Sequence, residues 1–359
     1  MKVKLGEYIQ EYSVRNKANE DIPVYSVTNT QGFCQDYFGK EVASKDKSTY
    51  KIVPRGYFAY NPSRINVGSV DWQRDEDQVI VSPLYNVFSV SPELNQQYLY
   101  YYLKSDFALH RIKAAATGSV RDNLKLEMLK NFPIRIPRVE EQEYIVQVLD
   151  KAKNIINLRR NELQKLDDLI KARFVEMFGE DIKQSNMTIA DIAEETTVGI
   201  ANSATHAYSE SGVVMLRNQN IRVNYLDDRD LIYIKQDFAE KYKNKALHEG
   251  DILVTRTGAN VGMACIVPKK YEGCQTFTTL ILRLRKDISI SPIFVCHYIN
   301  SPLGKSFVDE NKIGGGQPNF GAKQLSIMPI VVPSEEKQIA FDLFVNQVDK
   351  SKVVVASVR

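Results

Sequence analysis

Several polar loops of this 359-residue chain carry the side-chain types that hydrogen-bond to nucleic-acid bases. Two of them, NPSRINVG at residues 61–68 and TRTGANVG at residues 255–262, combine Arg and Asn with Ser, Thr and Gly. Arginine pairs with O6 and N7 of guanine, Asn and Gln pair with N6 and N7 of adenine, and small residues let the backbone approach phosphates. The candidate DNA-binding residues are Ser63, Arg64, Asn66, Ser119, Arg121, Arg217, Asn218, Arg222, Arg256, Thr257, Asn260, Gln317 and Asn319.

These loops also have a purely structural interpretation, because Gly, Asn and Ser are common turn residues. Asn123 and Asn319 occupy corresponding positions in two similar segments, so we interpret them as residues that hold a shared loop shape. Positions that differ between the two segments, such as Arg121 and Gln317, are better candidates for reading a DNA sequence. Arg64 belongs to the same group of candidates.

The sequence contains no recognisable motif for catalysis. Glycine-rich dinucleotide loops, a P-loop, the GxSxG turn, HExxH and the EF-hand loop are all absent. The nearest approach to the Asn/Asp-Pro-Pro-aromatic tetrad of adenine methyltransferases is NPSR at residues 61–64, which lacks the second proline and the aromatic residue. The four cysteines form no CxxC pair and the four histidines are scattered, so we predict free thiols, no metal site and no cofactor.

The net charge of +3 is too small to indicate a nucleic-acid-binding protein by itself. Residues 1–137 contain 18 Lys and Arg against 15 Asp and Glu, and residues 179–333 contain 17 of each. A DNA-binding surface would therefore have to come from local loops. Because the N-terminus has no apolar leader and no run of 18 apolar residues occurs, we expect a cytoplasmic protein without a membrane segment.

The chain contains an internal repeat. Residues 118–142 align with residues 314–338 at an offset of 196, and eight of the 25 aligned positions are identical. Residues 55–68 align with residues 249–262 at the similar offset of 194. Within each copy, short β-rich runs bounded by Gly, Pro and Asn alternate with helical patterns, so each copy is predicted to be a mixed domain.

A long amphipathic segment follows each domain. In the first, apolar residues return in steps of three and four for about four and a half heptads, and about 39 residues span roughly 58 Å as a helix. Two such segments in one chain are expected to form an intramolecular antiparallel pair, although a single amphipathic surface helix would show the same pattern. The predicted packing residues are Ile145, Leu149, Ile156, Leu163, Leu166 and Ile170 in the first helix and Phe341, Phe344 and Val348 in the second.

We therefore predict an α+β fold class, with two similar α/β domains joined by long helices that form an antiparallel coiled coil. The predicted domains cover residues 1–137 and 179–333, and the predicted helices cover residues 138–178 and 334–359.

This layout resembles the specificity subunits of type I restriction-modification enzymes, because PIRIPRVEEQ at 133–142 and PIVVPSEEKQ at 329–338 each lead from a domain into a long helix. The resemblance covers essentially the whole chain. It implies two target-recognition domains that each bind one half of a bipartite double-stranded DNA site. It also implies helices that set the spacing and dock two methyltransferase (modification) subunits. In that family S-adenosylmethionine and the flipped adenine belong to the modification subunits, and whether restriction subunits join stays open.

The length of the first helix agrees with this resemblance, because roughly 58 Å exceeds one DNA turn of about 34 Å. The second helix departs from the family's pattern, since it covers only 25 residues, 335–359. We expect either a shortened chain or a neighbouring copy that completes the helix pair, and hence self-association through this short helix.

Three other functions are compatible with the sequence. A specificity subunit of a methylation-only system would have the same layout. A protein-interaction scaffold built on a two-domain coiled coil would use the helices and leave the polar loops without a DNA role. A standalone enzyme has the least support, because no catalytic motif is present.

Overall fold

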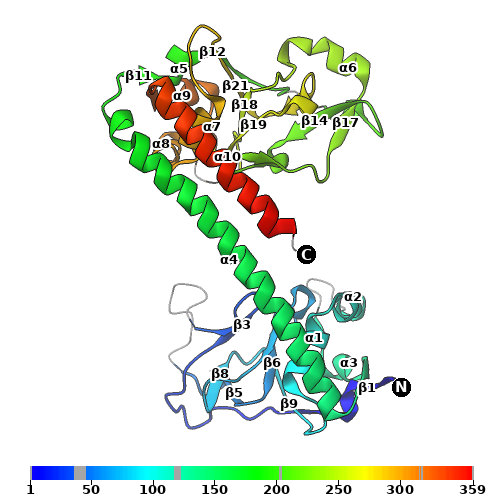
Figure 1. Cartoon of the computed structure of the whole chain (residues 1–359). Helices are drawn as coiled ribbons and strands as arrows, with labels where there is room; N and C mark the ends of the chain where they lie inside the picture. The colour runs from blue at the N-terminus through cyan, green and yellow to red at the C-terminus, as the bar shows by residue number, and fades with distance from the viewer. Residues whose placement is uncertain are drawn as a thin grey trace. The chain divides into compact units, whose positions relative to one another are not determined.

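The computed structural model of the chain describes residues 2–35, 46–116, 123–201, 204–314, 316 and 318–357. Its contacts divide the chain into two units, Met1–Ile156 and Asn157–Arg359 (Figure 1). The candidate residues Ser119, Arg121 and Gln317 lie outside the described residues.

Unit 1 is built on a four-stranded antiparallel sheet in which the strand order is β2-β9-β6-β7. Phe58 and Tyr60 on β6 and Phe88 on β9 are fully buried, so the sheet packs one apolar face against the helices. The strands of this unit are β1 (Lys2–Lys4), β2 (Ile9–Glu11), β3 (Ser26–Thr28), β4 (Gly32–Cys34), β5 (Lys51–Pro54), β6 (Phe58–Tyr60), β7 (Val70–Trp72), β8 (Gln78–Val81), β9 (Asn86–Val90) and β10 (Pro133–Arg135). Its helices are α1 (Gln96–Lys104), α2 (Asp106–Ala115) and α3 (Leu126–Lys130).

Unit 2 has a sheet of the same kind, in the order β12-β21-β18-β19, and a second four-stranded sheet in the order β13-β17-β14-β20. In the second sheet β14 and β20 run parallel. The strands are β11 (Met187–Thr188), β12 (Ala193–Val198), β13 (Tyr208–Ser209), β14 (Val213–Arg217), β15 (Ile221–Arg222), β16 (Tyr225–Leu226), β17 (Ile232–Ile234), β18 (Ile252–Val254), β19 (Ala264–Ile266), β20 (Gln275–Phe277), β21 (Leu280–Leu284) and β22 (Pro329–Ile330). The helices are α5 (Ile189–Ile192), α6 (Gln236–Lys241), α7 (Pro292–Asn300), α8 (Pro302–Asn311) and α9 (Ala322–Ser326).

The two units share one framework, in agreement with the sequence repeat, whereas their remaining strands pair differently. In each unit the first strand pairs antiparallel with the last one, β1 with β10 and β11 with β22. The principal sheet is followed by two successive helices, then a short helix, the returning strand and a long helix. The predicted fold class, two similar mixed domains joined to long helices, is confirmed.

The two long helices are α4 (Val139–Lys183) and α10 (Glu335–Ser357), drawn in green and red in Figure 1. Helix α4 continues five residues beyond the expected end at residue 178. Phe178 and Ile182 are buried in the core of unit 2, and this packing holds the last turns in helical form.

Within unit 2, α10 packs antiparallel to the second half of α4. The Nζ atom of Lys337 lies 2.8 Å from Asp181, and that of Lys352 lies 2.7 Å from Asp167, so rising numbers on one helix meet falling numbers on the other. Between these ion pairs, the Phe341 ring stands 5.5 Å from the ring of Phe174.

The predicted packing residues differ in exposure. Ile170, Phe341 and Val348 are buried in the core of unit 2, whereas Leu149 is 38% and Ile156 is 50% exposed. The remaining predicted positions are partly buried: Ile145, Leu163, Leu166 and Phe344.

Phe174 and Phe178 of α4 are also fully buried, although neither is among the predicted packing residues. Both phenylalanines also contact Phe294 on α7, so the buried face of α4 is set by the domain as well as by α10. Among the described residues, no helix combines the length and apolar content needed to cross a lipid bilayer.

Candidate nucleic-acid interface

Four of the candidate residues come together in unit 2. The Asn218 amide nitrogen donates to the Thr257 hydroxyl at 3.2 Å, and Nε of Arg256 donates to the Asn319 side-chain oxygen at 3.3 Å. Thr257 and Asn319 also face each other in an isolated antiparallel bridge. Three segments that are distant in sequence thus present amide, hydroxyl and guanidinium groups at one place, which we call the unit 2 cluster (Asn218, Arg256, Thr257 and Asn319).

Two polar atoms at this place are buried without a hydrogen-bond partner among the described residues. They are the side-chain oxygen of Asn218 and Nε of the adjacent Arg217. The other end of the Arg217 guanidinium donates to the Asp230 carbonyl at 2.6 Å. An unsatisfied buried polar atom costs about 1–3 kcal/mol, so such atoms mark a place where an incoming ligand can supply the missing partner.

Arg222 does not belong to the unit 2 cluster. Its guanidinium lies 3.2 Å from Asp227, which also receives a 2.7 Å contact from Arg229. Hydrogen bonds from Arg229, together with both positive charges, hold the pKa of Asp227 well below its usual range. The carboxylate of Asp227 therefore stays ionised and paired with Arg222, so the Arg222 side chain is less available to DNA. Asn260 is exposed and lines a separate hollow of the same unit.

In unit 1 the loop at residues 61–68 forms a compact turn. The backbone N–H and the hydroxyl of Ser63 both donate to the Asn61 side-chain oxygen, at 3.0 and 2.9 Å. The turn ends at Gly68, whose φ of 88° lies in the left-handed region that glycine adopts without strain. The side-chain oxygen of Asn66 is buried and unpartnered, while Arg64 is exposed. Ser63 is thus committed to the turn itself, and Arg64 is presented to solvent.

A family model described as the type I restriction modification DNA specificity domain matches residues 2–168 and again residues 183–351. The chain belongs to this family.

Two specificity subunits of type I restriction enzymes are similar in sequence to this chain. The subunit of the Escherichia coli K12 enzyme EcoKI is 19% identical over 259 residues, which are 67% of this chain and 56% of the relative. The subunit of the Methanocaldococcus jannaschii enzyme MjaVIII is 22% identical over 264 residues, 69% of this chain and 62% of the relative. These matches span 56% and 62% of the two relatives, which is less than two thirds of the length of each.

Solved structures show the same fold. A chain from a study of complex assembly and conformational transition of the type I system has a TM-score of 0.56 at 18% identity, covering 99% of this chain and 92% of that one. The specificity subunit from M. genitalium has a TM-score of 0.50 at 13% identity, with the same coverage.

A buried glutamine anchors each long helix to its own domain. In unit 1 the Gln142 amide donates to the carbonyls of Glu93 and Pro137, at 2.8 and 2.9 Å, and its oxygen accepts the Asn95 N–H at 2.9 Å. Asn95 is also the N-cap of α1, so one side chain fixes the start of α4 against the start of α1.

Gln338 makes the same three bonds in unit 2. It donates to the carbonyls of Ser289 and Pro333, at 3.0 and 2.8 Å, and accepts the N–H of Ser291, the N-cap of α7, at 2.6 Å. We call these two residues the glutamine anchors. Sequence reasoning missed their role, although their recurrence in EEQ and EEKQ was the available signal.

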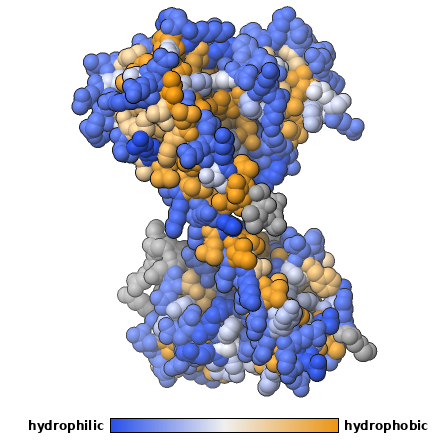
Figure 2. All heavy atoms as spheres, viewed as in Figure 1, coloured by the Kyte–Doolittle hydropathy of each residue, from blue (hydrophilic) through white to orange (hydrophobic). Residues whose placement is uncertain are grey.

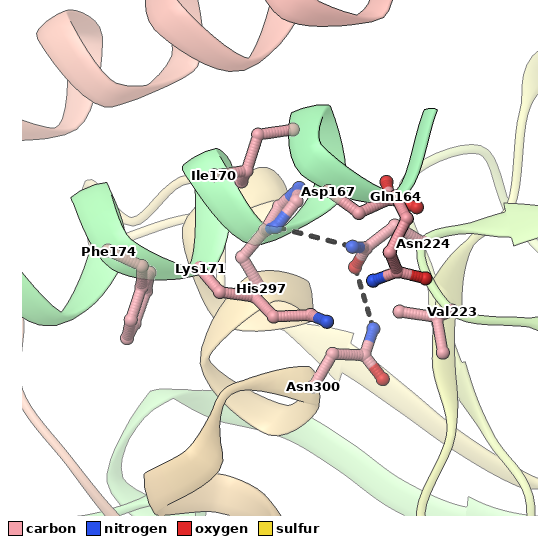
Figure 3. A pocket seen from close by; sticks show the side chains of 9 residues that line it. All are labelled: Gln164, Asp167, Ile170, Lys171, Phe174, Val223, Asn224, His297 and Asn300. Atoms are coloured by element: carbon pink, nitrogen blue, oxygen red, sulfur yellow. Dashed lines mark hydrogen bonds between the residues drawn. The ribbon is translucent and has the colours of Figure 1, made fainter. Parts of the chain in front are cut away.

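A pocket lined by both polar and apolar side chains lies where the β15–β16 hairpin of unit 2 meets α4 and α7 (Figure 3). At the hairpin tip, the Asn224 amide donates to Nδ1 of His297 at 3.3 Å and accepts from Asn300 at 2.6 Å. Burial lowers the pKa of His297 to about 4, so the ring is neutral at physiological pH and accepts the Asn224 hydrogen. Asn224 and His297 tie the hairpin to α7, and sequence reasoning identified neither contact.

No group of three or more His, Cys, Asp or Glu side chains suited to a metal ion occurs within the described part of the chain. The four cysteines are free thiols. Burial raises the pKa of the Cys265 and Cys274 thiols, which keeps both protonated and unreactive at neutral pH.

Proposed function

We propose that this chain is the DNA-sequence-recognition subunit of a type I restriction-modification system and has no catalytic activity of its own. The observation that carries the proposal is the duplicated specificity domain, in which polar loops of unit 2 converge on the unit 2 cluster. Each domain, residues 1–137 and 179–333, would bind one half of a bipartite double-stranded DNA site. Action on DNA would place the chain in the cytoplasm.

The helices at residues 138–178 and 334–359 are proposed to dock two modification subunits, which would supply S-adenosylmethionine and the methyl transfer. The exposed apolar residues of α4 support this assignment, because a solvated helix without a partner rarely exposes several large apolar side chains. They include Val148 at 47%, Ile155 at 56% and Leu158 at 67% exposure. Restriction subunits would join the same assembly in a system that also cleaves DNA.

Self-association through α10 is a further part of the proposal. Ile339, Leu343 and Val353 on this helix are exposed, and hydrophobic patches interrupt the mainly hydrophilic surface in Figure 2. Sedimentation of the chain over a range of concentrations measures this association. A chain that stays monomeric at all concentrations by itself, and that is present as a single copy in the assembly with modification subunits, contradicts it.

The proposal is tested by reconstituting the chain with its modification subunits and mapping methylated adenines on genomic DNA. We expect methylation at one split motif, with binding that weakens steeply as salt is raised. Methylation without sequence preference refutes the proposal. A scaffold role would instead be indicated if substitutions in the unit 2 cluster leave the methylated motif unchanged while substitutions on α4 abolish assembly.

A further inference from the structure

The arginines of the candidate set differ in what they already bind. Arg217 donates to the Asp230 carbonyl, Arg222 is paired with Asp227, and Arg256 donates to Asn319. Arg64 is exposed, and its guanidinium has no hydrogen bond or ion pair with any described residue. Among the described candidates it is therefore the arginine whose five N–H donors are all available to a ligand.

Arg64 stands at the edge of a hollow of about 330 Å³ in unit 1. The hollow lies between the β3–β4 hairpin, the turn at residues 61–68 and the ring of Tyr85. Its lining contains no carboxylate: apart from Arg64, the polar side chains are Asn, Ser, Thr and Tyr. An acceptor-rich ligand would thus meet no repelling negative charge among the lining groups.

Two amides in this lining have their orientation fixed by neighbours that can only donate. The Asn61 side-chain oxygen accepts the N–H of Ser63 at 3.0 Å, and the Asn29 oxygen accepts the Lys104 ammonium at 3.1 Å. Because the oxygen of each side chain faces these donors, the NH2 group of each points the other way and has no hydrogen-bond partner among the described residues. Together with Arg64, these groups offer the hollow hydrogen-bond donors.

Donor-only recognition selects among the bases. In the major groove guanine presents two adjacent acceptors, N7 and O6, whereas adenine and cytosine each present an amino donor. The fork of an arginine matches the two guanine acceptors in a bidentate contact. Phosphate oxygens offer the same acceptor chemistry, so the two sources need separate tests.

We infer that Arg64, supported by the NH2 groups of Asn29 and Asn61, reads a guanine in the half-site bound by unit 1. This inference rests on the proposed function and deepens it, because it assigns a base to one domain. Arg64 is a specificity-determining residue in this assignment, and the two asparagines position the guanine edge.

The test uses the complete assembly of the chain with its modification subunits, and compares the methylated motif for the wild type, Arg64→Gln and Arg64→Lys. We expect Arg64→Gln to reduce the preference for guanine at one position of one half-site by about tenfold or more, with the other half-site unchanged. Arg64→Lys keeps the charge but loses the fork, so we expect wild-type salt dependence with a weaker guanine preference.

Arg55→Gln is the matched control, because Arg55 is also an exposed arginine of unit 1 but is paired with Asp77 at 3.1 Å. We expect its motif to equal that of the wild type. Folding of all three variants is checked by their assembly with the modification subunits.

Several results overturn the inference. Arg64→Gln methylating all sites equally slowly, with a shallower salt dependence, assigns the side chain to a phosphate. An unchanged motif, or a wild-type motif without guanine in either half-site, also overturns it. All of these results are compatible with the proposed function. A wild-type assembly that methylates DNA without any sequence preference refutes the proposed function itself.

Discussion

Replacing Gln338 with methionine tests the energetic role of the glutamine anchors. Methionine has a similar length and flexibility, but it cannot accept the Ser291 N–H or donate to the Ser289 and Pro333 carbonyls. The Gln338 side chain is 5% exposed, so water cannot replace these three bonds without opening the site. The substitution leaves three buried backbone groups without a partner, at about 1–3 kcal/mol for each, so the free energy of unfolding of unit 2 is expected to fall by at least about 3 kcal/mol.

The assay is urea unfolding of the full chain, followed by hydrogen exchange of α7 and α10 to assign the transition to unit 2. Gln347→Met is the matched control, because it makes the same chemical change at an exposed position of the same helix. We expect the control to change the unfolding free energy by at most about 0.5 kcal/mol. Gln142→Met should give a loss similar to that of Gln338→Met, but in unit 1.

The reasoning is refuted if Gln338→Met costs no more than Gln347→Met. It is also refuted if the loss appears in the exchange of unit 1 and leaves α7 and α10 protected as in the wild type.

Three further predictions concern unit 2. The pKa of His297 is about 6.5 in the unfolded state and about 4 in the folded state. Between pH 4 and 6.5 the folded state therefore binds fewer protons than the unfolded state. The contribution of neutral His297 to the free energy of unfolding is complete above pH 6.5 and is lost as the pH falls towards 4. Between pH 7 and 5, the free energy of unfolding measured in urea should therefore fall by about 2 kcal/mol more for the wild type than for His297→Gln. Equal losses in the two proteins contradict this. Phe174→Ala removes the ring that stacks on Phe294 and should cost about 3–5 kcal/mol of unfolding free energy, against less than about 1 kcal/mol for Leu169→Ala at a 48% exposed position. Asn218→Ala should relax one position of one half-site in the methylated motif, by about 1–3 kcal/mol of discrimination, and a uniform loss of methylation at all sites would instead indicate a structural role.

The duplication and the two long helices could be predicted from the sequence, because repeats and heptad spacing are local patterns. The glutamine anchors could not, since Gln142 bonds to Asn95, which lies 47 residues away, and the repeat shows only that a glutamine recurs. The heptad spacing did not identify Phe174 and Phe178 as buried residues of α4, because both pack against Phe294 of α7. Sequence spacing alone cannot locate that third element.

The candidate interface was predictable as a set of loops and not as a set of contacts. Asn218, Thr257 and Asn319 come from three separate loops, and the structure brings them together. Arg222 had the same residue type as Arg64, but its neighbour Asp227 pairs with it across the hairpin. Which arginines are neutralised depends on tertiary distances, so only the structure separates them.

The glutamine anchors also place few demands on the sequence of the domain that each one holds. Because both anchors bond mainly to backbone carbonyls and one backbone N–H, they impose no side-chain identity on the domain, only a chain path that returns to the helix start. We expect that a foreign domain that keeps the path from its last strand through the proline to EEQ or EEKQ folds onto the same helix. We therefore expect an exchange of the domain body to leave the long helix and the surface it presents unchanged.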